Sequence, residues 1–290
     1  GATRAHLDKL VRVWRHMGEP RLVIDTRHLA RVREHLEEAG DSDSAERLAA
    51  RAISDEPSAV ETPAEPAPAR PEQTAFIQFS SGSTGDPKGV VLTHANILAN
   101  IDAISTGSEM GEHEIALSWM PLTHDMGLIG FHLTLVYSAF THYLMTPDLF
   151  ARRPLLWLEK ASEKGATLLC SPNFGYRHVL RAIKARGLPD GLDLSPVRLI
   201  YNGAEPISAP LAREFITELA PCGLADNVMF CVYGMAEASL AASFPPPERG
   251  LASIRVAATT LGVGDAIQPS EAPQTIELVD LGQPVKGADI

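Results

Sequence analysis

Short apolar runs alternate with helical patterns along residues 74–290, and this alternation restricts the possible folds more than any other feature of the chain. The apolar runs cover residues 75–80, 115–120, 142–145, 166–170, 198–202, 228–233 and 275–281. Helical patterns begin at His94 and near Gly127, and others cover residues 155–164, 176–184 and 211–219. Parallel strands need long crossover connections, which are usually helices. The sequence therefore predicts an α/β fold of parallel sheets with crossover helices.

The amino-terminal residues are organised differently, and we expect them to form a separate region. Apolar residues at helical spacing, from Leu7 to Met17, predict a surface helix. An apolar run at residues 21–25 predicts a strand, and Thr26 is a candidate cap for a helix that continues towards Gly40. Prolines interrupt any helix or strand in the Ala-, Pro- and Glu-rich stretch that follows. We therefore expect a partial helix and strand region at 1–52, a linker at 53–73 and a core at 74–290.

Composition excludes several classes of function. The formal net charge of the 290 residues is −11, and no basic stripe with interleaved aromatic residues offsets it. A nucleic acid would be repelled and is not an expected partner. No apolar run is long enough to span a bilayer, and the amino terminus lacks the pattern of a secretory signal, so we expect a cytoplasmic protein. The 3 cysteines have no CxxC spacing, which argues against a zinc ribbon or a disulfide framework.

The segment SSGSTGDPKG at residues 80–89 carries the strongest chemical signal and directly follows an apolar run. Glycines let a backbone approach an anion, hydroxyls and amides donate hydrogen bonds, and a lysine adds a positive charge. The residues of this candidate phosphate loop are Ser80, Ser81, Gly82, Ser83, Thr84, Gly85 and Lys88. The segment is not the P-loop of nucleoside triphosphatases, because Pro87 precedes the lysine and Gly89 follows it. We interpret it as a phosphate-binding loop of another kind.

Three further segments follow in a fixed order: PLTHDMGLIG at 121–130, NGAEPI at 202–207 and YGMAEAS at 233–239. Together with residues 80–89, they resemble the signatures of the adenylate-forming superfamily. The stretches FIQFSSGSTGDPKGVVLTH, HDMGLIG, SPNFGY and NGAEPIS look most like fatty acyl-AMP ligases and the acyl-ligase loading domains of polyketide and hybrid synthases. The resemblance implies that residues 74–290 belong to the large N-terminal domain of the adenylate-forming fold. It also implies that a fatty acid is activated with ATP and Mg²⁺ as acyl-AMP, for transfer to an acyl carrier protein.

The resemblance further implies a role for individual residues. His124, Glu237 and Lys88 would be catalytic, and Glu237 would also hold Mg²⁺, which prefers carboxylate and phosphate oxygens. The ATP and AMP site would comprise the phosphate loop together with Gly203, Ala204, Glu205, Tyr233, Gly234, Met235, Ala236 and Ser239. The acyl site would comprise His124, Asp125, Asn173, Phe174 and Gly175.

The family pattern also raises expectations about the whole enzyme. The final residues, LGQPVKGADI, resemble the segment before the ribose-binding aspartate of the family, and neither that aspartate nor the mobile subdomain with its lysine follows. We therefore expect a truncated core that is weakly active or inactive alone. The stretch between Glu237 and Leu281 resembles an insertion of fatty acyl-AMP ligases, which favours a carrier protein as the acceptor. An acyl-CoA ligase core and a nucleotide-binding module without turnover are the alternatives.

Overall fold

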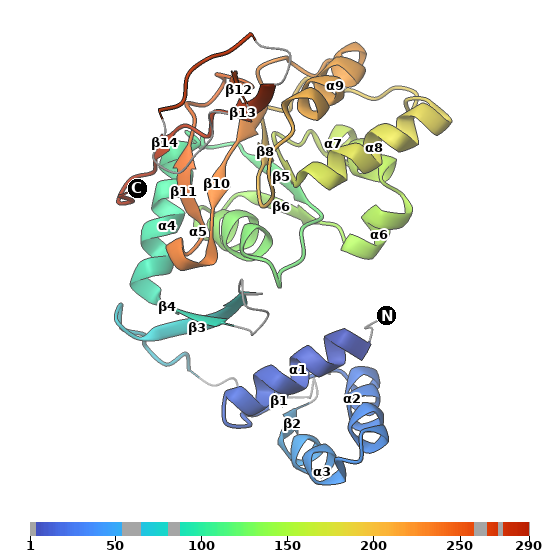
Figure 1. Cartoon of the computed structure of the whole chain (residues 1–290), viewed down its shortest axis with the longest axis vertical. Coiled ribbons are helices and arrows are strands. Elements are labelled where there is room, and N and C mark those ends of the chain that lie inside the picture. The colour runs from blue at the N-terminus through green and yellow to red at the C-terminus, as the bar shows by residue number, and fades with distance from the viewer. Residues whose placement is uncertain (1–3, 54–64, 81–87, 258–265, 272–274, 290) are drawn as a thin grey trace. The chain divides into compact units, whose positions relative to one another are not determined.

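A computed structural model describes residues 4–53, 65–80, 88–257, 266–271 and 275–289 (Figure 1). The described residues fall into two compact units. The first comprises residues within Gly1–Ala69 and Phe79–Gly89, and the second comprises residues within Arg70–Gln78 and Val90–Ile290.

The first unit contains small helices around a short parallel strand pair. Its elements are α1 (Arg4–His16), β1 (Leu22–Val23), α2 (Thr26–Glu38), α3 (Ser42–Arg51) and β2 (Ala52–Ile53), and β1 pairs with β2. Leu7, Val11 and Trp14 are buried, which confirms most of the predicted apolar face of α1, but Met17 lies beyond the end of the helix and is exposed. Asp25 rather than Thr26 caps α2, because its carboxylate accepts a hydrogen bond from the backbone N–H of His28 at 2.9 Å. The helix α3 was not predicted.

The strands β3 (Thr74–Ser80) and β4 (Lys88–Thr93) pair with each other. The helix α4 (His94–Gly107) begins where β4 ends, as the sequence predicts. A capping box starts α4, because the Thr93 side chain accepts from the backbone N–H of Asn96 while the Asn96 side chain accepts from the backbone N–H of Thr93.

The described part of the second unit is built on a parallel sheet of five strands in the order β6-β5-β7-β8-β9. The strands are β5 (Ile115–Ser118), β6 (Thr141–Leu144), β7 (Leu168–Ser171), β8 (Leu199–Asn202) and β9 (Met229–Cys231). Each overlaps an apolar run identified in the sequence, so the predicted parallel α/β fold is confirmed. All residues of β7, β8 and β9 are buried, as expected for strands covered on both faces.

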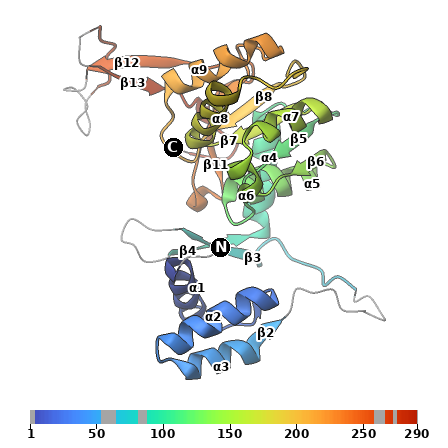
Figure 2. The same cartoon turned by 90° about the vertical axis from the view of Figure 1, so that its right-hand side faces the viewer.

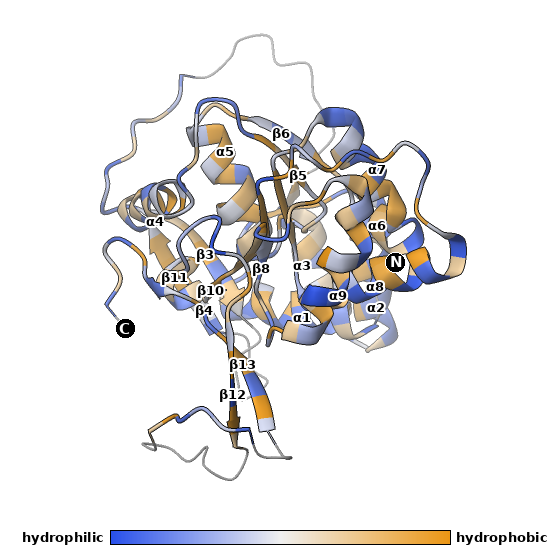
Figure 3. Cartoon of the chain, turned by 90° about the horizontal axis from the view of Figure 1, so that it is seen from above, coloured by the Kyte–Doolittle hydropathy of each residue, from blue (hydrophilic) through white to orange (hydrophobic). Residues whose placement is uncertain are grey.

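Helices cover both faces of this sheet (Figures 1 and 3). On one side lie α4 and α5 (Thr134–Tyr137), and on the other lie α6 (Pro147–Arg152), α7 (Leu155–Lys164), α8 (Asn173–Arg186) and α9 (Ala209–Leu219). The helix predicted near Gly127 is a π-helix, η1 (Met126–Leu133). Thr134, the residue directly after η1, donates a hydrogen bond from its hydroxyl to the carbonyl of Ile129 at 2.8 Å. Across the described residues, we find no helix with the length and hydrophobicity that crossing a membrane requires.

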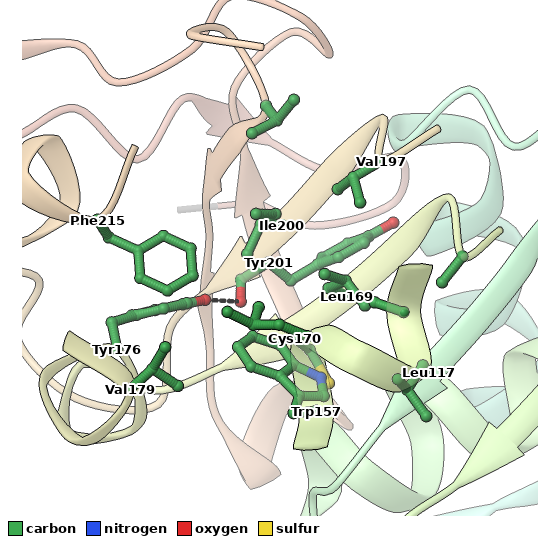
Figure 4. Close-up of a cluster of buried hydrophobic side chains, with 14 of the residues drawn as sticks. Leu117, Trp157, Leu169, Cys170, Tyr176, Val179, Val197, Ile200, Tyr201 and Phe215 are labelled. Atoms are coloured by element: carbon green, nitrogen blue, oxygen red, sulfur yellow. Dashed lines mark hydrogen bonds between the residues drawn. The ribbon is translucent and has the colours of Figure 1, made fainter. Parts of the chain in front are cut away.

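Aromatic side chains from α7, α8 and α9 fill the core beside β7 and β8 (Figure 4). Trp157, Tyr176 and Phe215 are each 0% exposed. The Tyr176 hydroxyl donates to the carbonyl of Tyr201 at 2.8 Å, which satisfies its polar group without water. Cys170 is also buried, and burial raises the pKa of its thiol to about 12. The core therefore fixes α8 against β8, the two elements from which several candidate site residues extend.

Smaller antiparallel pairs complete the second unit. They comprise β10 (Tyr233–Gly234), β11 (Ala241–Phe244), β12 (Ser253–Ala257), β13 (Thr275–Val279) and β14 (Gln283–Pro284). The short 3₁₀ helices η2 (Ala220–Cys222) and η3 (Ala236–Ala238) precede β9 and β11 respectively. The strands β12 and β13 run side by side and project from the sheet (Figure 2). Strand β13 matches the last predicted apolar run, whereas β12 lies in a stretch for which no strand was predicted.

Candidate active site

Candidate residues gather at the edge of the sheet where its parallel strands end. The amino end of α8 follows β7, Gly203 follows β8, and β10 follows β9 after a single residue. Ligands of parallel α/β proteins bind at this edge, because the loops that leave the strands meet there. The topology thus brings together segments that are far apart in the sequence.

His124 and Asp125 form a pair at the amino end of η1. His124 Nδ1 lies 2.8 Å from Asp125 Oδ1, and the backbone N–H of Met126 donates to the same carboxylate at 2.7 Å. The hydrogen bond to Asp125 raises the pKa of His124, although partial burial opposes the shift. The carboxylate therefore orients the imidazole and favours its protonated, cationic form.

An apolar cavity lies beside this pair, and together with its open mouth it holds about 480 Å³ of empty space. Asp125, Ala204, Tyr233 and Gly234 line it, so a residue predicted to bind the acid meets residues predicted to bind the nucleotide. Much of the remaining wall is hydrophobic and includes Ile104, Phe131, Leu240 and Phe244. An open cavity with an apolar lining and few polar groups suits the apolar part of a small organic ligand.

The NGAEPI segment passes along a second hollow, of about 1050 Å³, that shares Tyr233 with the cavity. Ala204 and Glu205 line it, and Ala204 has a φ of +68°, a left-handed conformation that is uncommon for a residue with a Cβ. Gly203 is tightly packed, since a Cβ there would lie 2.9 Å from the carbonyl oxygen of Val232. The hollow therefore combines backbone groups held in fixed positions with the half-exposed ring of Tyr233.

Asn173, Phe174 and Gly175 lie at the start of α8 and do not line the 480 Å³ cavity. The Asn173 side-chain amide donates to the Pro206 carbonyl, and the Phe174 backbone N–H donates to Glu205 Oε1 at 2.7 Å. The Glu205 carboxylate therefore caps α8, where the helix dipole favours negative charge. Of the residues assigned to the acyl site, the structure brings only Asp125 to this cavity.

Glu237 and Ser239 line a third hollow, of about 950 Å³, together with Met235. Glu237 is exposed, and no hydrogen bond or ion pair within the described residues engages its carboxylate. No group of three or more His, Cys, Asp and Glu side chains gathers among the described residues. A Mg²⁺ ion here would therefore take its other ligands from phosphate oxygens and water, which is the usual arrangement for this ion. A carboxylate beside an open hollow fits that donor set.

The phosphate loop lies mostly outside the described residues. Ser81, Gly82, Ser83, Thr84 and Gly85 fall in the undescribed stretch 81–87. Ser80 is the last residue of β3, and Lys88 is an exposed residue at the start of β4.

Sequence reasoning missed several residues that shape the cavity. Ile104 comes from α4, Phe131 from η1, and Leu240 and Phe244 from the segment around β11. They come from three separate apolar stretches, and no local pattern distinguishes a cavity wall from ordinary core. The signal that could have identified Leu240 is its position directly after YGMAEAS.

The parallel sheet and the cavity beside its strand ends define a class: an α/β protein that binds its ligand at the carboxyl edge of the central sheet. Within that class the chain belongs to the AMP-binding enzyme family, whose sequence description matches residues 6–266. This confirms membership of the adenylate-forming superfamily that the motifs predicted.

Individual relatives give more detail. A Caulobacter vibrioides protein provisionally named an acyl-CoA synthetase is 40% identical over 182 residues, 62% of this chain and 32% of its own length. The medium-chain-fatty-acid–[acyl-carrier-protein] ligase TtuA of Teredinibacter turnerae is 34% identical over 226 residues, 78% of this chain and 35% of its own.

Among solved structures, the fatty acyl-adenylate ligase of Legionella pneumophila in complex with acyl adenylate and pyrophosphate matches with a TM-score of 0.79 and 27% identity. The match covers 97% of this chain and 48% of that one. The chain thus spans about a third of the length of these curated relatives and about half of that structure.

Proposed function

We propose that this chain forms the nucleotide- and acyl-binding core of an ATP-dependent acyl-AMP ligase that activates a fatty acid. One observation carries the proposal: Asp125, Ala204 and Tyr233, from three separate motifs, line one apolar cavity. The relatives named as fatty-acid ligases and the structural neighbour that holds acyl adenylate support the same reaction.

In this reaction a carboxylate oxygen attacks the α-phosphorus of ATP, the bond between the α- and β-phosphates breaks, and pyrophosphate leaves. The protein mainly positions the reactants and stabilises negative charge. We propose that the 480 Å³ cavity takes the hydrocarbon part of the acid and that the hollow on the other side of Tyr233 takes the adenine. His124, whose pKa the hydrogen bond to Asp125 raises, would then attract the acid carboxylate at the mouth of the cavity when its imidazole is protonated.

We assign Glu237 and Ser239 to the phosphates. Mg²⁺ held by Glu237 would neutralise phosphate charge, while the Ser239 hydroxyl would donate a hydrogen bond to the α-phosphate. Lys88 and the phosphate loop would bind the departing pyrophosphate. The carboxylate of Glu237 is exposed and makes no hydrogen bond or ion pair to any residue that the structure describes, which supports this assignment.

Calorimetry with the 290-residue chain tests the proposal. A non-hydrolysable dodecanoyl-adenylate analogue should bind with a 1:1 stoichiometry, and dodecanoic acid should compete with it. Absence of binding at millimolar analogue would refute the proposed function.

Glu237→Gln tests the metal role. It keeps the shape of the side chain but removes the anionic ligand, so Mg²⁺-dependent ATP affinity should fall at least about tenfold, or about 1.4 kcal/mol. Glu112→Gln is the matched control, because Glu112 is equally an exposed glutamate but lies in the turn before β5. Equal ATP titrations for wild type and Glu237→Gln, with unchanged melting, would remove Glu237 from the site.

A second function differs in the acyl acceptor. The 40% identical Caulobacter relative favours coenzyme A, whereas the Teredinibacter relative favours an acyl carrier protein, which we propose as the acceptor. The natural polypeptide that contains these residues should be given fatty acid and ATP with either acceptor, and the acyl thioesters quantified. If acyl-CoA formed faster than the acyl thioester of the carrier protein, the acyl-CoA ligase alternative would be established.

A further inference from the structure

A buried amide on α4 binds the loop that carries Glu237 and Ser239. Asn100 is 9% exposed and lies near the middle of α4, a helix that contacts β11. Its Nδ2 donates to the carbonyls of Ala238 at 3.2 Å and Ala241 at 3.0 Å. The backbone N–H of Ala241 donates back to Asn100 Oδ1 at 2.9 Å. One side chain thus bonds the backbone on both sides of Ser239.

Ser239 needs such support because its backbone is strained. Its φ of +68° and ψ of −59° fall in the rare γ-turn region, which is unfavourable for any residue with a Cβ. Such conformations persist only where surrounding contacts determine them. Ser239 is 5% exposed and follows η3, the short helix that contains Glu237. The strain therefore sits at Ser239, whose hydroxyl the proposed function assigns to phosphate, two residues after the Glu237 assigned to magnesium.

The strained residue and its support both face the third hollow. Asn100, Glu237 and Ser239 all line this hollow of about 950 Å³. If the γ-turn relaxed to an ordinary turn, Ser239 would rotate and η3 would move with it. The side-chain amide of Asn100 has one favoured orientation, because its nitrogen donates and its oxygen accepts a hydrogen bond. Rotation that exchanged the nitrogen and the oxygen would lose these hydrogen bonds.

We infer that Asn100 is a positioning residue, which holds Ser239 in its strained conformation and so fixes the direction in which Glu237 and Ser239 face a Mg²⁺-bound phosphate. The inference rests on the proposed function of the hollow. Asn100 itself acts only through the loop.

Two variants and a rescue test the inference. Asn100→Ala removes the amide, and Asn100→Asp keeps its shape but replaces the donor by an acceptor facing two carbonyls. Either should weaken Mg²⁺-dependent ATP binding about tenfold in calorimetry. Glycine adopts a positive φ readily, so in a Ser239→Gly background the further effect of Asn100→Ala should shrink to about twofold or less.

Thr167→Val is the control for general destabilisation. Its hydroxyl accepts from the backbone N–H of Ile115 at 3.0 Å, on the side of the sheet where β5 and β7 begin. This variant should lower the melting temperature without changing ATP affinity. A second readout is amide hydrogen exchange at Ala241, which should accelerate at least about tenfold in Asn100→Ala but not in Thr167→Val.

The outcomes separate the two proposals. Unchanged ATP affinity in both Asn100 variants, or an equal loss with serine and glycine at position 239, would overturn the positioning role. Failure of wild type to bind ATP, or an inert Glu237→Gln, would instead overturn the proposed function. In that case amide hydrogen exchange at Ala241 still tests whether Asn100 holds the loop, and an unchanged exchange rate in Asn100→Ala would refute it.

Discussion

Arg198 and Glu114 form a buried ion pair in the second unit, which we call the sheet unit because it contains the five-stranded sheet. Removal of either partner should destabilise this unit strongly. The side chain of Glu114 is 6% exposed and that of Arg198 is 24% exposed. Arg198 Nε donates to Glu114 Oε1 at 3.1 Å, and Arg198 Nη1 donates to the carbonyl of Ser108 at 3.0 Å. The Gly111 backbone N–H also donates to Glu114 at 3.3 Å. The pair therefore joins the segment after α4 to the starts of β5 and β8.

The magnitude follows from burial. Loss of one partner leaves an unpaired buried charge, which costs about 3–5 kcal/mol. Arg198 keeps some contact with water and Glu114 keeps the hydrogen bond from Gly111, so we expect the lower end, about 3 kcal/mol, for either Glu114→Leu or Arg198→Met. For a unit of this size that corresponds to a fall in melting temperature of about 6–12 °C. The double variant leaves no unpaired charge, so it should lose less than either single variant, about 2 kcal/mol or less, and far less than the sum of about 6.

The assay is thermal unfolding followed by tryptophan fluorescence in a Trp14→Phe background. The signal then comes from Trp119 and Trp157, which both lie in the sheet unit. The pair lies where strands begin, so binding of the acyl-adenylate analogue should not change at 20 °C. Single losses below about 1 kcal/mol, or a double loss equal to the sum, would refute the reasoning.

Two further predictions concern a histidine and a glycine. Burial and a neighbouring histidine lower the pKa of His142 to about 4, so between about pH 4 and 6.5 the unfolded chain binds a proton that the folded chain does not. Stability should therefore rise with pH across this window, and urea denaturation of His142→Gln should show a smaller rise. At Gly175 a Cβ would lie 2.0 Å from Ser171 Oγ and 2.8 Å from Trp119 Cζ2, so Gly175→Ala should lose about 2 kcal/mol. Gly111→Ala, which meets nothing within 4 Å, should stay within about 0.5 kcal/mol, and similar losses in both variants would contradict this account.

The sheet unit was predictable because its signals are local. The predicted helix at 155–164 coincides with α7, and the strand predicted at 198–202 starts one residue before β8. Boundaries failed where side-chain chemistry outweighed periodicity, as when Asp25 caps α2 in place of Thr26. The π-helical geometry of η1 was not predictable, since periodicity cannot distinguish one wide turn from an ordinary helix.

The candidate site was predictable only in part. Motif order identified Asp125, Ala204 and Tyr233, which the fold brings to one cavity. Asn173 and Phe174 instead contact the NGAEPI segment and Trp119, because α8 starts at the end of β7, beside β8 and the NGAEPI segment that follows it. Asn100 was missed altogether. Its partners are 138 and 141 residues away, and an isolated asparagine in a helix carries no local signal of that contact.

The π-helix η1 has a consequence for how ligand preference can evolve. A π-helix bonds residue i to i+5, whereas an α-helix bonds i to i+4. Deletion of one residue within η1 would restore α-helical spacing and rotate every later side chain of the segment by about 100°. Phe131 would then leave the cavity wall, and a neighbouring side chain would replace it. Natural selection can therefore change the shape of this cavity through the length of one segment, without substituting any residue that lines it.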